Sequence, residues 1–215
     1  VVGRQGRFGA FQPIAASDLS AGAIYAHASK AVVEIAASGD TQTRAQGSGF
    51  VYDRQGHIVT NQHVVAGATS ISVSFWNGVE LQAAVVGTDP STDIAVLRVN
   101  APAGLLTPLR LADSSALEVG DPVLAMGSPF GLEGTITSGI VSALHREMTA
   151  PNNFTITDTI QTDAAINHGN SGGPLIDVAT NTVIGINDQI PAGTVDANVG
   201  IGFASPINVA KASAQ

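Results

Sequence analysis

The sequence predicts an all-β protein built from two β-barrels. Short runs of β-branched residues alternate with turn residues along most of the chain, a pattern typical of antiparallel strands. The 215 residues are 44% hydrophobic, so the chain is long enough to bury a substantial core, and all-β chains of this length commonly form one domain. No stretch approaches the roughly 20 consecutive apolar residues needed to span a bilayer. We therefore expect one folded all-β domain with no membrane segment in this chain.

The first half of the chain is predicted to hold an N-terminal arm with a short helix, residues 1–30, followed by the first barrel. Residues 1–16 show no clear period, and Ser17 and Asp18 are suited to cap a helix that runs to Lys30. From about residue 31 to 99, strand-like runs alternate with turns such as 53–56 and 76–78. Residues 100–118 carry two prolines and a glycine, and we expect them to connect the barrels.

The second barrel is predicted between about residues 120 and 204. Strand signals lie at 122–126, 135–144, 155–161, 174–178, 182–187 and 199–204. Closing these strands into a barrel would remove unpaired strand edges. Pro206 suits the first turn of a helix, which predicts a terminal helix at 207–214 within a C-terminal segment 207–215.

The most informative segment is Gly169-Asn170-Ser171-Gly172-Gly173-Pro174-Leu175. A serine set between glycines on a tight turn is how a serine protease presents its nucleophile. The glycines would let the backbone N–H groups of Gly169 and Ser171 converge on the point where a carbonyl oxygen becomes an oxyanion. A Gly-rich turn between strands can also contain a serine with no chemical role, so the segment needs partners before it indicates catalysis.

His63 and Asp93 are the candidate partners. His63 follows a β-branched strand signal, and Asp93 precedes another. A serine hydroxyl needs a neutral imidazole to take its proton, and a carboxylate holds that imidazole in the right tautomer. Each residue alone is equally compatible with a structural role. Their chain order, His63, Asp93, Ser171, is that of chymotrypsin-like enzymes, not of subtilisins or α/β-hydrolases, and the intervals leave room for one barrel and then another.

An extended set of blocks resembles the HtrA/Deg family of serine proteases, a branch of the chymotrypsin-like clan. The blocks occur in family order at 47–51, 60–65, 93–98, 120–131, 137–142, 161–167 and 200–204. The resemblance covers about residues 31 to 206. It implies a chymotrypsin-like double six-stranded β-barrel with short N- and C-terminal helices, and it makes residues 31–206 a trypsin-like protease domain.

The resemblance also suggests roles around the nucleophile. It implies an oxyanion hole at Gly169, Asn170 and Ser171, and a substrate pocket bordered by Ala165, Ile166, Ile186 and Asn187. Enzymes that cleave after Lys or Arg carry an aspartate where this chain has Ala165, so we expect cleavage after small or medium aliphatic residues, with a broad preference. Segments 129–134, 144–154, 165–170 and 187–198 correspond to family loops that order or disorder the oxyanion hole.

His168 departs from the family pattern, which usually has a small residue, proline or arginine ahead of Gly-Asn-Ser. An unperturbed imidazole titrates near ~6.5, so a modulating role in substrate contact or pH sensing is one interpretation, and an incidental loop residue is the other.

Composition excludes several classes of function. The net charge of −8 argues against nucleic-acid binding, because phosphates require clustered Lys and Arg. There are no cysteines, so neither disulfides nor a thiolate site can form. His27, His57 and His145 do not have metal-ligand spacing with any carboxylate cluster, and we predict no metal and no cofactor.

By resemblance, the chain is expected to be a serine endopeptidase that hydrolyses unfolded or misfolded proteins in stress-related quality control. The same resemblance implies an extracytoplasmic enzyme (periplasmic, envelope-bound or secreted) and a homotrimer formed through the N-terminal arm. Phe8, Phe11 and Tyr25 are the aromatic candidates for the trimer contact, although they can equally pack on their own barrel. The chain opens at Val1 and stops at Gln215, so a signal or anchor and the PDZ domains of the family are expected to lie outside it. Two alternatives remain: a resting-state chaperone or scaffold, and an unregulated secreted protease of the same fold.

Overall fold

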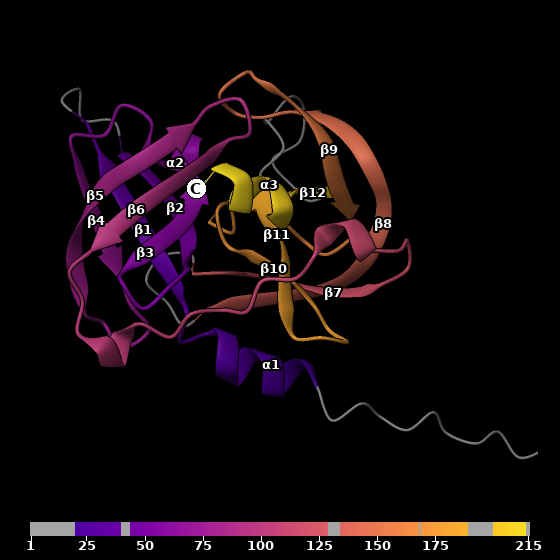
Figure 1. Cartoon of the computed structure of the whole chain (residues 1–215), viewed down its shortest axis with the longest axis horizontal. Helices are drawn as coiled ribbons and strands as arrows, with labels where there is room; N and C mark the ends of the chain where they lie inside the picture. The colour runs from indigo at the N-terminus through magenta and orange to yellow at the C-terminus, as the bar shows by residue number, and fades with distance from the viewer. Residues whose placement is uncertain (1–19, 40–43, 129–133, 168, 189–199, 214–215) are drawn as a thin grey trace, which may run out of the picture.

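Two six-stranded antiparallel barrels form the protein (Figure 1), which confirms the predicted fold class. The computed structural model describes residues 20–39, 44–128, 134–167, 169–188 and 200–213. Each barrel joins its strands in the same order, first-second-third-sixth-fifth-fourth, and closes by pairing the fourth strand with the first. The chain therefore uses one topology twice. Figure 1 shows the first barrel in indigo to magenta and the second mainly in orange.

The first barrel contains six strands and one short helix. The strands are β1 (Val32–Ser38), β2 (Arg44–Val51), β3 (His57–Asn61), β4 (Ser70–Ser74), β5 (Glu80–Asp89) and β6 (Ile94–Val99). Helix α2 (Gln62–Val65) follows β3 directly. The burial of β1 and β6 alternates along much of each strand, as expected when one face of a strand points into a barrel.

The second barrel contains β7 (Pro122–Gly127), β8 (Thr135–Thr149), β9 (Thr155–Thr162), β10 (Pro174–Asp177), β11 (Thr182–Asp188) and β12 (Gly202–Pro206). Between the barrels lie two short 3-10 helices, η1 (Ala103–Leu105) and η2 (Ser114–Ala116). One expectation was wrong: β8 extends to Thr149, so much of the segment predicted as a loop at 144–154 is strand. Its pairing with β9 shifts register three times, which lets a 15-residue strand bend around the barrel.

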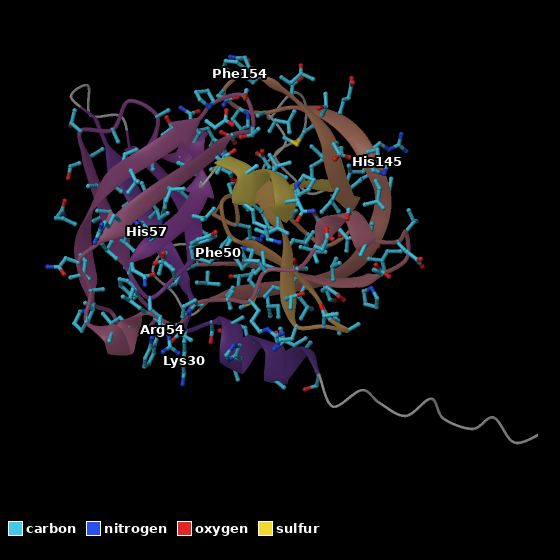
Figure 2. The ribbon with its side chains drawn as sticks, in the orientation of Figure 1. Lys30, Phe50, Arg54, His57, His145 and Phe154 are labelled. Carbon is cyan, nitrogen blue, oxygen red and sulfur yellow. The ribbon has the colours of Figure 1, made fainter. Side chains whose placement is uncertain are left out.

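Three main clusters of apolar side chains make up the core. One fills the first barrel and a second fills the second barrel. The third joins the barrels to each other, with Phe50 and Val59 from the first packed with Leu124 and Met126 from the second. Phe50, labelled near the centre of Figure 2, is completely buried. Because this shared cluster cannot form without both barrels, it fixes their relative position and therefore the geometry of any site between them.

Helix α1 (Ala21–Ala28) packs on the shared cluster through Ile24 and Ala28. Its N-cap is Ser20, whose hydroxyl accepts a hydrogen bond from the Ala23 N–H, and the helix starts later than the predicted cap at residues 17–18, which lie outside the described part of the chain. Tyr25 packs against the same cluster, so this aromatic ring lies on its own barrels. Phe8 and Phe11 lie outside the described residues.

Helix α3 (Ile207–Ser213), near the centre of Figure 1, contacts both barrels. Ser213 donates to Asp89 on β5, and the Asn208 amide donates to Asp113 beside η2, at 2.7 Å. The hydrogen bond from Asn208 and those from Ser115 lower the pKa of Asp113 from 3.8 to about 2. The Ser91 hydroxyl likewise lowers the pKa of Asp89. Both contacts thus favour the ionised carboxylate in the folded protein.

Candidate active site

His63 and Asp93 form a closely coupled pair in the first barrel. His63 lies on helix α2, just after β3, and Asp93 immediately precedes β6, the strand that pairs with β3. The His63 ring Nδ1 is 2.6 Å from Asp93 Oδ2, and the His63 backbone N–H donates to Asp93 Oδ1 at 2.9 Å. Because Nδ1 faces a carboxylate, it carries the ring proton, and Nε2 is the atom that can accept another.

The backbone at Asp93 is folded to aim its carboxylate at the imidazole. Asp93 has φ of +53°, a left-handed conformation that is uncommon for residues with a side chain, and it is completely buried. Its carbonyl accepts hydrogen bonds from the Gln62 N–H and the Asn61 amide, at 2.9 and 3.1 Å. Asp93 therefore holds the start of helix α2 with its backbone and the His63 ring with its side chain.

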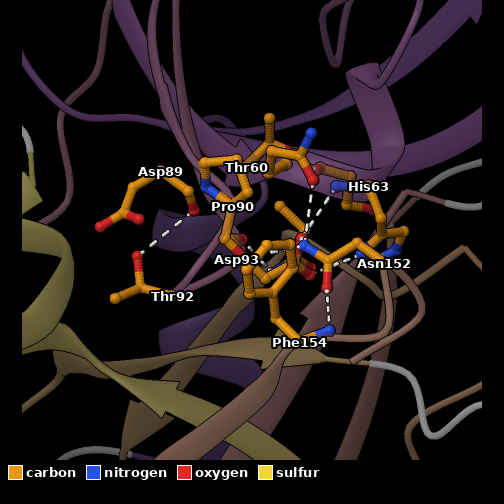
Figure 3. A network of polar contacts seen from close by, with 11 residues as sticks. Thr60, His63, Asp89, Pro90, Thr92, Asp93, Asn152 and Phe154 are labelled. Carbon is orange, nitrogen blue, oxygen red and sulfur yellow. Dashed lines mark hydrogen bonds and ion pairs between the residues drawn. The ribbon is translucent and has the colours of Figure 1, made fainter. Parts of the chain in front are cut away.

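Asn152, from the turn between β8 and β9, also reaches Asp93. Its amide nitrogen lies 3.2 Å from Asp93 Oδ1, 3.0 Å from Gln62 Oε1 and 3.0 Å from the Pro90 carbonyl (Figure 3). The amide oxygen accepts from the Phe154 N–H, which settles the amide orientation. Sequence reasoning missed this residue, because a turn asparagine carries no local signal that a carboxylate 59 positions away lies beside it.

A second His–Asp pair illustrates why spacing alone is insufficient. His57 Nδ1 lies 2.5 Å from Asp53 Oδ2. Burial alone would raise the pKa of Asp53, but hydrogen bonds from the His57 ring and backbone and from the Gln55 N–H lower it overall. His57 starts β3 whereas His63 follows its end, so the length of the strand, about 13 Å, separates their backbone positions. Figure 2 labels His57, and also His145, whose exposed ring pairs with Asp158 on the second barrel.

Ser171 lies on a turn of the second barrel that is held from both sides. Its carbonyl accepts a hydrogen bond from the Ser48 N–H on β2, at 2.7 Å. From β11, Asn187 accepts from the Gly172 N–H and donates to the Gly173 carbonyl, both at 2.9 Å. Gly172 has φ of +84°, and a Cβ there would lie 2.1 Å from the Ser48 carbonyl oxygen, so only glycine fits this turn. The Ser171 turn is thus fixed between the two barrels.

Three polar groups on this turn are left for another molecule. The Ser171 hydroxyl is buried without a hydrogen-bond partner, and within the described residues it does not reach His63. In that same part of the chain, the N–H groups of Gly169 and Ser171 have no acceptor. Gly169 has φ of +98°, another conformation that suits glycine. Buried polar groups are normally paired, so their concentration at one turn indicates a binding position for a polar atom.

Ser48 fixes the carbonyl side of the same loop. Its hydroxyl donates to the Gly169 carbonyl at 2.5 Å and accepts from the Ser128 N–H at 2.8 Å, while its own side chain is completely buried. Its carbonyl accepts from the Thr60 hydroxyl at 2.6 Å, on the strand that leads to His63. Ser48 therefore links strand β3, through Thr60, to the loop that carries Gly169 and Ser171. The Gly47-Ser48-Gly49 block was visible in the sequence, but not this bridging role.

The predicted pocket residues occupy two kinds of position. Ala165 is half-buried, and Ile166 packs against Gly202, where an added Cβ would lie 2.9 Å from the Ile166 Cδ1. Ile186 is completely buried in the cluster between the barrels, and the Asn187 amide donates to the carbonyls of Met126 and Pro174. The side chains of Ile186 and Asn187 therefore support the Ser171 turn from within the core, and the assignment of these residues to a substrate pocket stays a prediction.

Asn170, predicted at the oxyanion hole, is 3% exposed and braces the loop from inside. Its N–H donates to the Asn167 carbonyl at 3.0 Å, its carbonyl accepts from the Gly173 N–H at 2.9 Å, and its side chain packs on Gly127. The described residues do not include His168 or the segments 129–133 and 189–198.

Asp188, at the end of β11, completes a cluster of titratable side chains. One atom from each of His63, Asp93 and Asp188 lies within 4.8 Å of the others, and Asp188 is completely buried. His63 Nδ1 and both Asp93 oxygens are engaged in hydrogen bonds within the pair and with Asn152, so we interpret this cluster as an acid–base unit. Asp188 falls in the segment 187–198 that the resemblance assigned to a loop, and nothing in the sequence indicated that it lies beside the imidazole.

The fold and this constellation define a class of protein. The family model described as a trypsin-like peptidase domain matches residues 47–186, and the chain belongs to that family. Within it, the chain is an HtrA/Deg-type serine protease domain. It is 49% identical over 168 residues to "Periplasmic serine endoprotease DegP" of Escherichia coli (strain K12), a match that covers 78% of this chain and 34% of that protein.

Two further comparisons agree with this assignment. The chain is 49% identical over 168 residues to "Protease Do-like 1, chloroplastic" of Arabidopsis thaliana, covering 77% of this chain and 37% of that one. A solved structure of "HtrA-type protease AlgW with tripeptide" superposes with a TM-score of 0.78 at 40% identity, covering 88% of this chain and 60% of the other. The chain thus spans about a third of the length of these curated relatives. Among the described residues, no helix has the length and apolar character needed to cross a membrane.

Proposed function

We propose that this protein is a serine endopeptidase in which Ser171 is the nucleophile, His63 the general base and Asp93 the residue that orients the base. The observation that carries the proposal is the His63–Asp93 pair, bonded at 2.6 Å with Asp93 completely buried, together with an unpaired, buried Ser171 hydroxyl on a turn clamped between the barrels. Peptide hydrolysis by a serine needs an imidazole that can accept a proton and a serine hydroxyl that can attack the substrate carbonyl.

The reaction follows from the geometry. Ser171 Oγ attacks the substrate carbonyl and gives its proton to His63 Nε2. Asp93, bonded to Nδ1 and supported by Asn152, stabilises the imidazolium that forms. The N–H groups of Gly169 and Ser171, which have no acceptor among the described residues, receive the developing oxyanion. His63 then returns the proton to the leaving amine, and water repeats the sequence to release the acyl group.

The proposed substrates are unfolded or misfolded polypeptides cleaved after small or medium aliphatic residues. Ala165 supplies no negative charge for Lys or Arg, and Ile166 offers an apolar surface beside it. An extended chain suits a cleft between two barrels, and an apolar pocket separates neighbouring aliphatic residues by only about 1–3 kcal/mol, which suits varied substrates. We further propose an extracytoplasmic quality-control role, supported by the periplasmic relative, and homotrimers formed through the N-terminal arm.

The experiment that tests this proposal combines labelling and turnover. A fluorescent phosphonate with a valine-like side chain is expected to label the wild type at Ser171 and to leave Ser171→Ala unlabelled, and the wild type is expected to cleave casein. A matched control is Ser115→Ala, which changes an exposed serine in η2 and should leave both activities unchanged. Absence of labelling and cleavage across several temperatures would contradict the assignment.

One observation favours a second candidate, a resting form that acts mainly as a chaperone. The Ser171 hydroxyl does not bond to His63 within the described residues, whereas an active pair requires that contact during the reaction. This candidate predicts that Ser171→Ala suppresses aggregation of an unfolded protein as well as the wild type does, with negligible turnover in both. Rapid cleavage by the wild type would reject it.

A further inference from the structure

We propose that Asp188 is a positioning residue of the catalytic centre whose carboxylate is a second negative charge for His63, and that it sets the pH at which the base becomes available. The inference rests on the proposed function, because it assigns His63 as the base. It starts from three observations: Asp188 is completely buried, one of its oxygens lies within 4.8 Å of a His63 nitrogen, and the same oxygen lies within 4.8 Å of an Asp93 oxygen.

The fold holds Asp188 rigidly in this place. It is the last residue of β11, and it pairs with Phe203 of β12. Its chain neighbour Asn187 makes two backbone hydrogen bonds with the nucleophile turn and two more through its side chain. Any shift of the Asp188 backbone would therefore disturb the Ser171 turn. The carboxylate is placed by the same strand that positions the nucleophile.

The charged groups around Asp188 come from separate elements. Helix α2 supplies His63, and the turn before β6 supplies Asp93. The β8–β9 turn contributes a neutral amide, Asn152, which binds Asp93, and β12 places Phe203 opposite Asp188. Within the described residues, the cluster thus contains two carboxylates and one imidazole.

Two carboxylates beside one imidazole have two opposing effects. At separations below 5 Å, a negative charge favours the imidazolium over the neutral ring, so removing the Asp188 charge is expected to make neutral His63 available at a lower pH. The imidazolium also forms during the reaction, so the same charge speeds the step once His63 is neutral. The Asp188 carboxylate thus lowers activity at low pH and raises kcat at higher pH.

The test uses the full chain with Asp188→Asn, which keeps the shape and removes the charge. In the Ser171→Ala background, the chemical shift of a His63 ring proton is followed by NMR from pH 4 to 9. The His63 signal is identified by its absence from the spectrum of the His63→Ala variant. We expect the His63 titration midpoint to fall by about one pH unit in Asp188→Asn. Asp158→Asn is the matched control, since it removes an exposed acid of the same barrel that pairs with His145, and it should leave the midpoint unchanged.

Steady-state kinetics, measured in proteins that retain Ser171, supply the second measurement. In Asp188→Asn, the acid limb of the kcat/KM profile should move to lower pH by a similar amount, and kcat above the limb should fall about three- to tenfold. If Asp188→Asn does not fold by circular dichroism, Asp188→Ser replaces it. An unchanged or raised His63 midpoint in a folded variant overturns the proposal. The NMR arm needs no turnover, so a protein without protease activity would reject the proposed function separately.

Discussion

Ser48→Ala is the most discriminating test of how the two barrels cooperate. The substitution removes the hydroxyl that donates to the Gly169 carbonyl and accepts from the Ser128 N–H, with no change in the backbone bond from Ser48 to Ser171. Both lost hydrogen bonds are partly buried. Leaving two such groups unpaired is expected to cost about 1–3 kcal/mol of unfolding free energy.

The catalytic effect follows from the position of Gly169. Its carbonyl belongs to the peptide beside the proposed oxyanion donors, so without Ser48 the loop can rotate its N–H groups away from the substrate. Losing one donor completely costs roughly a hundred- to a thousand-fold in kcat, which sets the upper limit. We expect kcat to fall at least about tenfold with little change in KM, because the donors act on the transition state.

The assay compares kcat and KM on a peptide substrate with urea unfolding of each variant. Thr159→Val is the matched control: its hydroxyl is completely buried and donates to the Arg146 carbonyl in the same barrel, away from the nucleophile turn. It should lose stability but retain kcat. A Ser48→Ala enzyme with kcat within about threefold of wild type would refute the positioning role.

Three further outcomes are expected. Asn152→Leu should lower kcat/KM about tenfold, because Asp93 loses a donor while its bond to the imidazole remains, and steady-state kinetics against wild type measures this. Gly172→Ala should cost about 2–4 kcal/mol and abolish phosphonate labelling, whereas Gly78→Ala, with similar positive φ but open space around it, should cost about 1 kcal/mol in thermal unfolding. The folded-state pKa of Asp113 is lowered to about 2, so its stabilisation is present above pH 3.8 and is lost as pH falls through 2; Asp113→Asn should flatten acid unfolding over that window, and an equally steep curve would contradict this.

Part of the site could be predicted from the sequence because its geometry depends on residues that are close together in the chain. The turn around Ser171 requires glycine at Gly172, where positive φ and a close carbonyl exclude a side chain, so the motif records a geometric demand. Likewise, apart from the end of β8, the strand patterns predicted the strands of the second barrel to within a few residues, since alternation along a strand follows from a barrel with one buried face.

Other features depended on contacts between distant segments. Ser48 and Gly169 lie 121 positions apart, and Asn152 and Gln62 lie 90 apart, so no local pattern connects them. Ile186 and Asn187 were predicted at the pocket because they are near Ser171 in the family pattern, yet their side chains point into the core. The sequence does not say which face of a short strand near a turn is buried, because a bulge can change it; β10 and β11 contain such a register shift.

The sequence by itself determined the fold class and the strand succession, and it predicted His63, Asp93 and Ser171 as the catalytic residues, because order and motif restrict the topology that can bring them together. Only the tertiary structure decided how the centre is held and charged. In the folded protein, Ser48 contacts the loop at Gly169, Asn152 contacts Asp93, and the Asp188 carboxylate lies within 4.8 Å of the imidazole. The physical reason is that hydrogen bonding and electrostatic coupling depend on distances of a few ångströms, which the packing of two barrels sets and the spacing of residues along one chain does not.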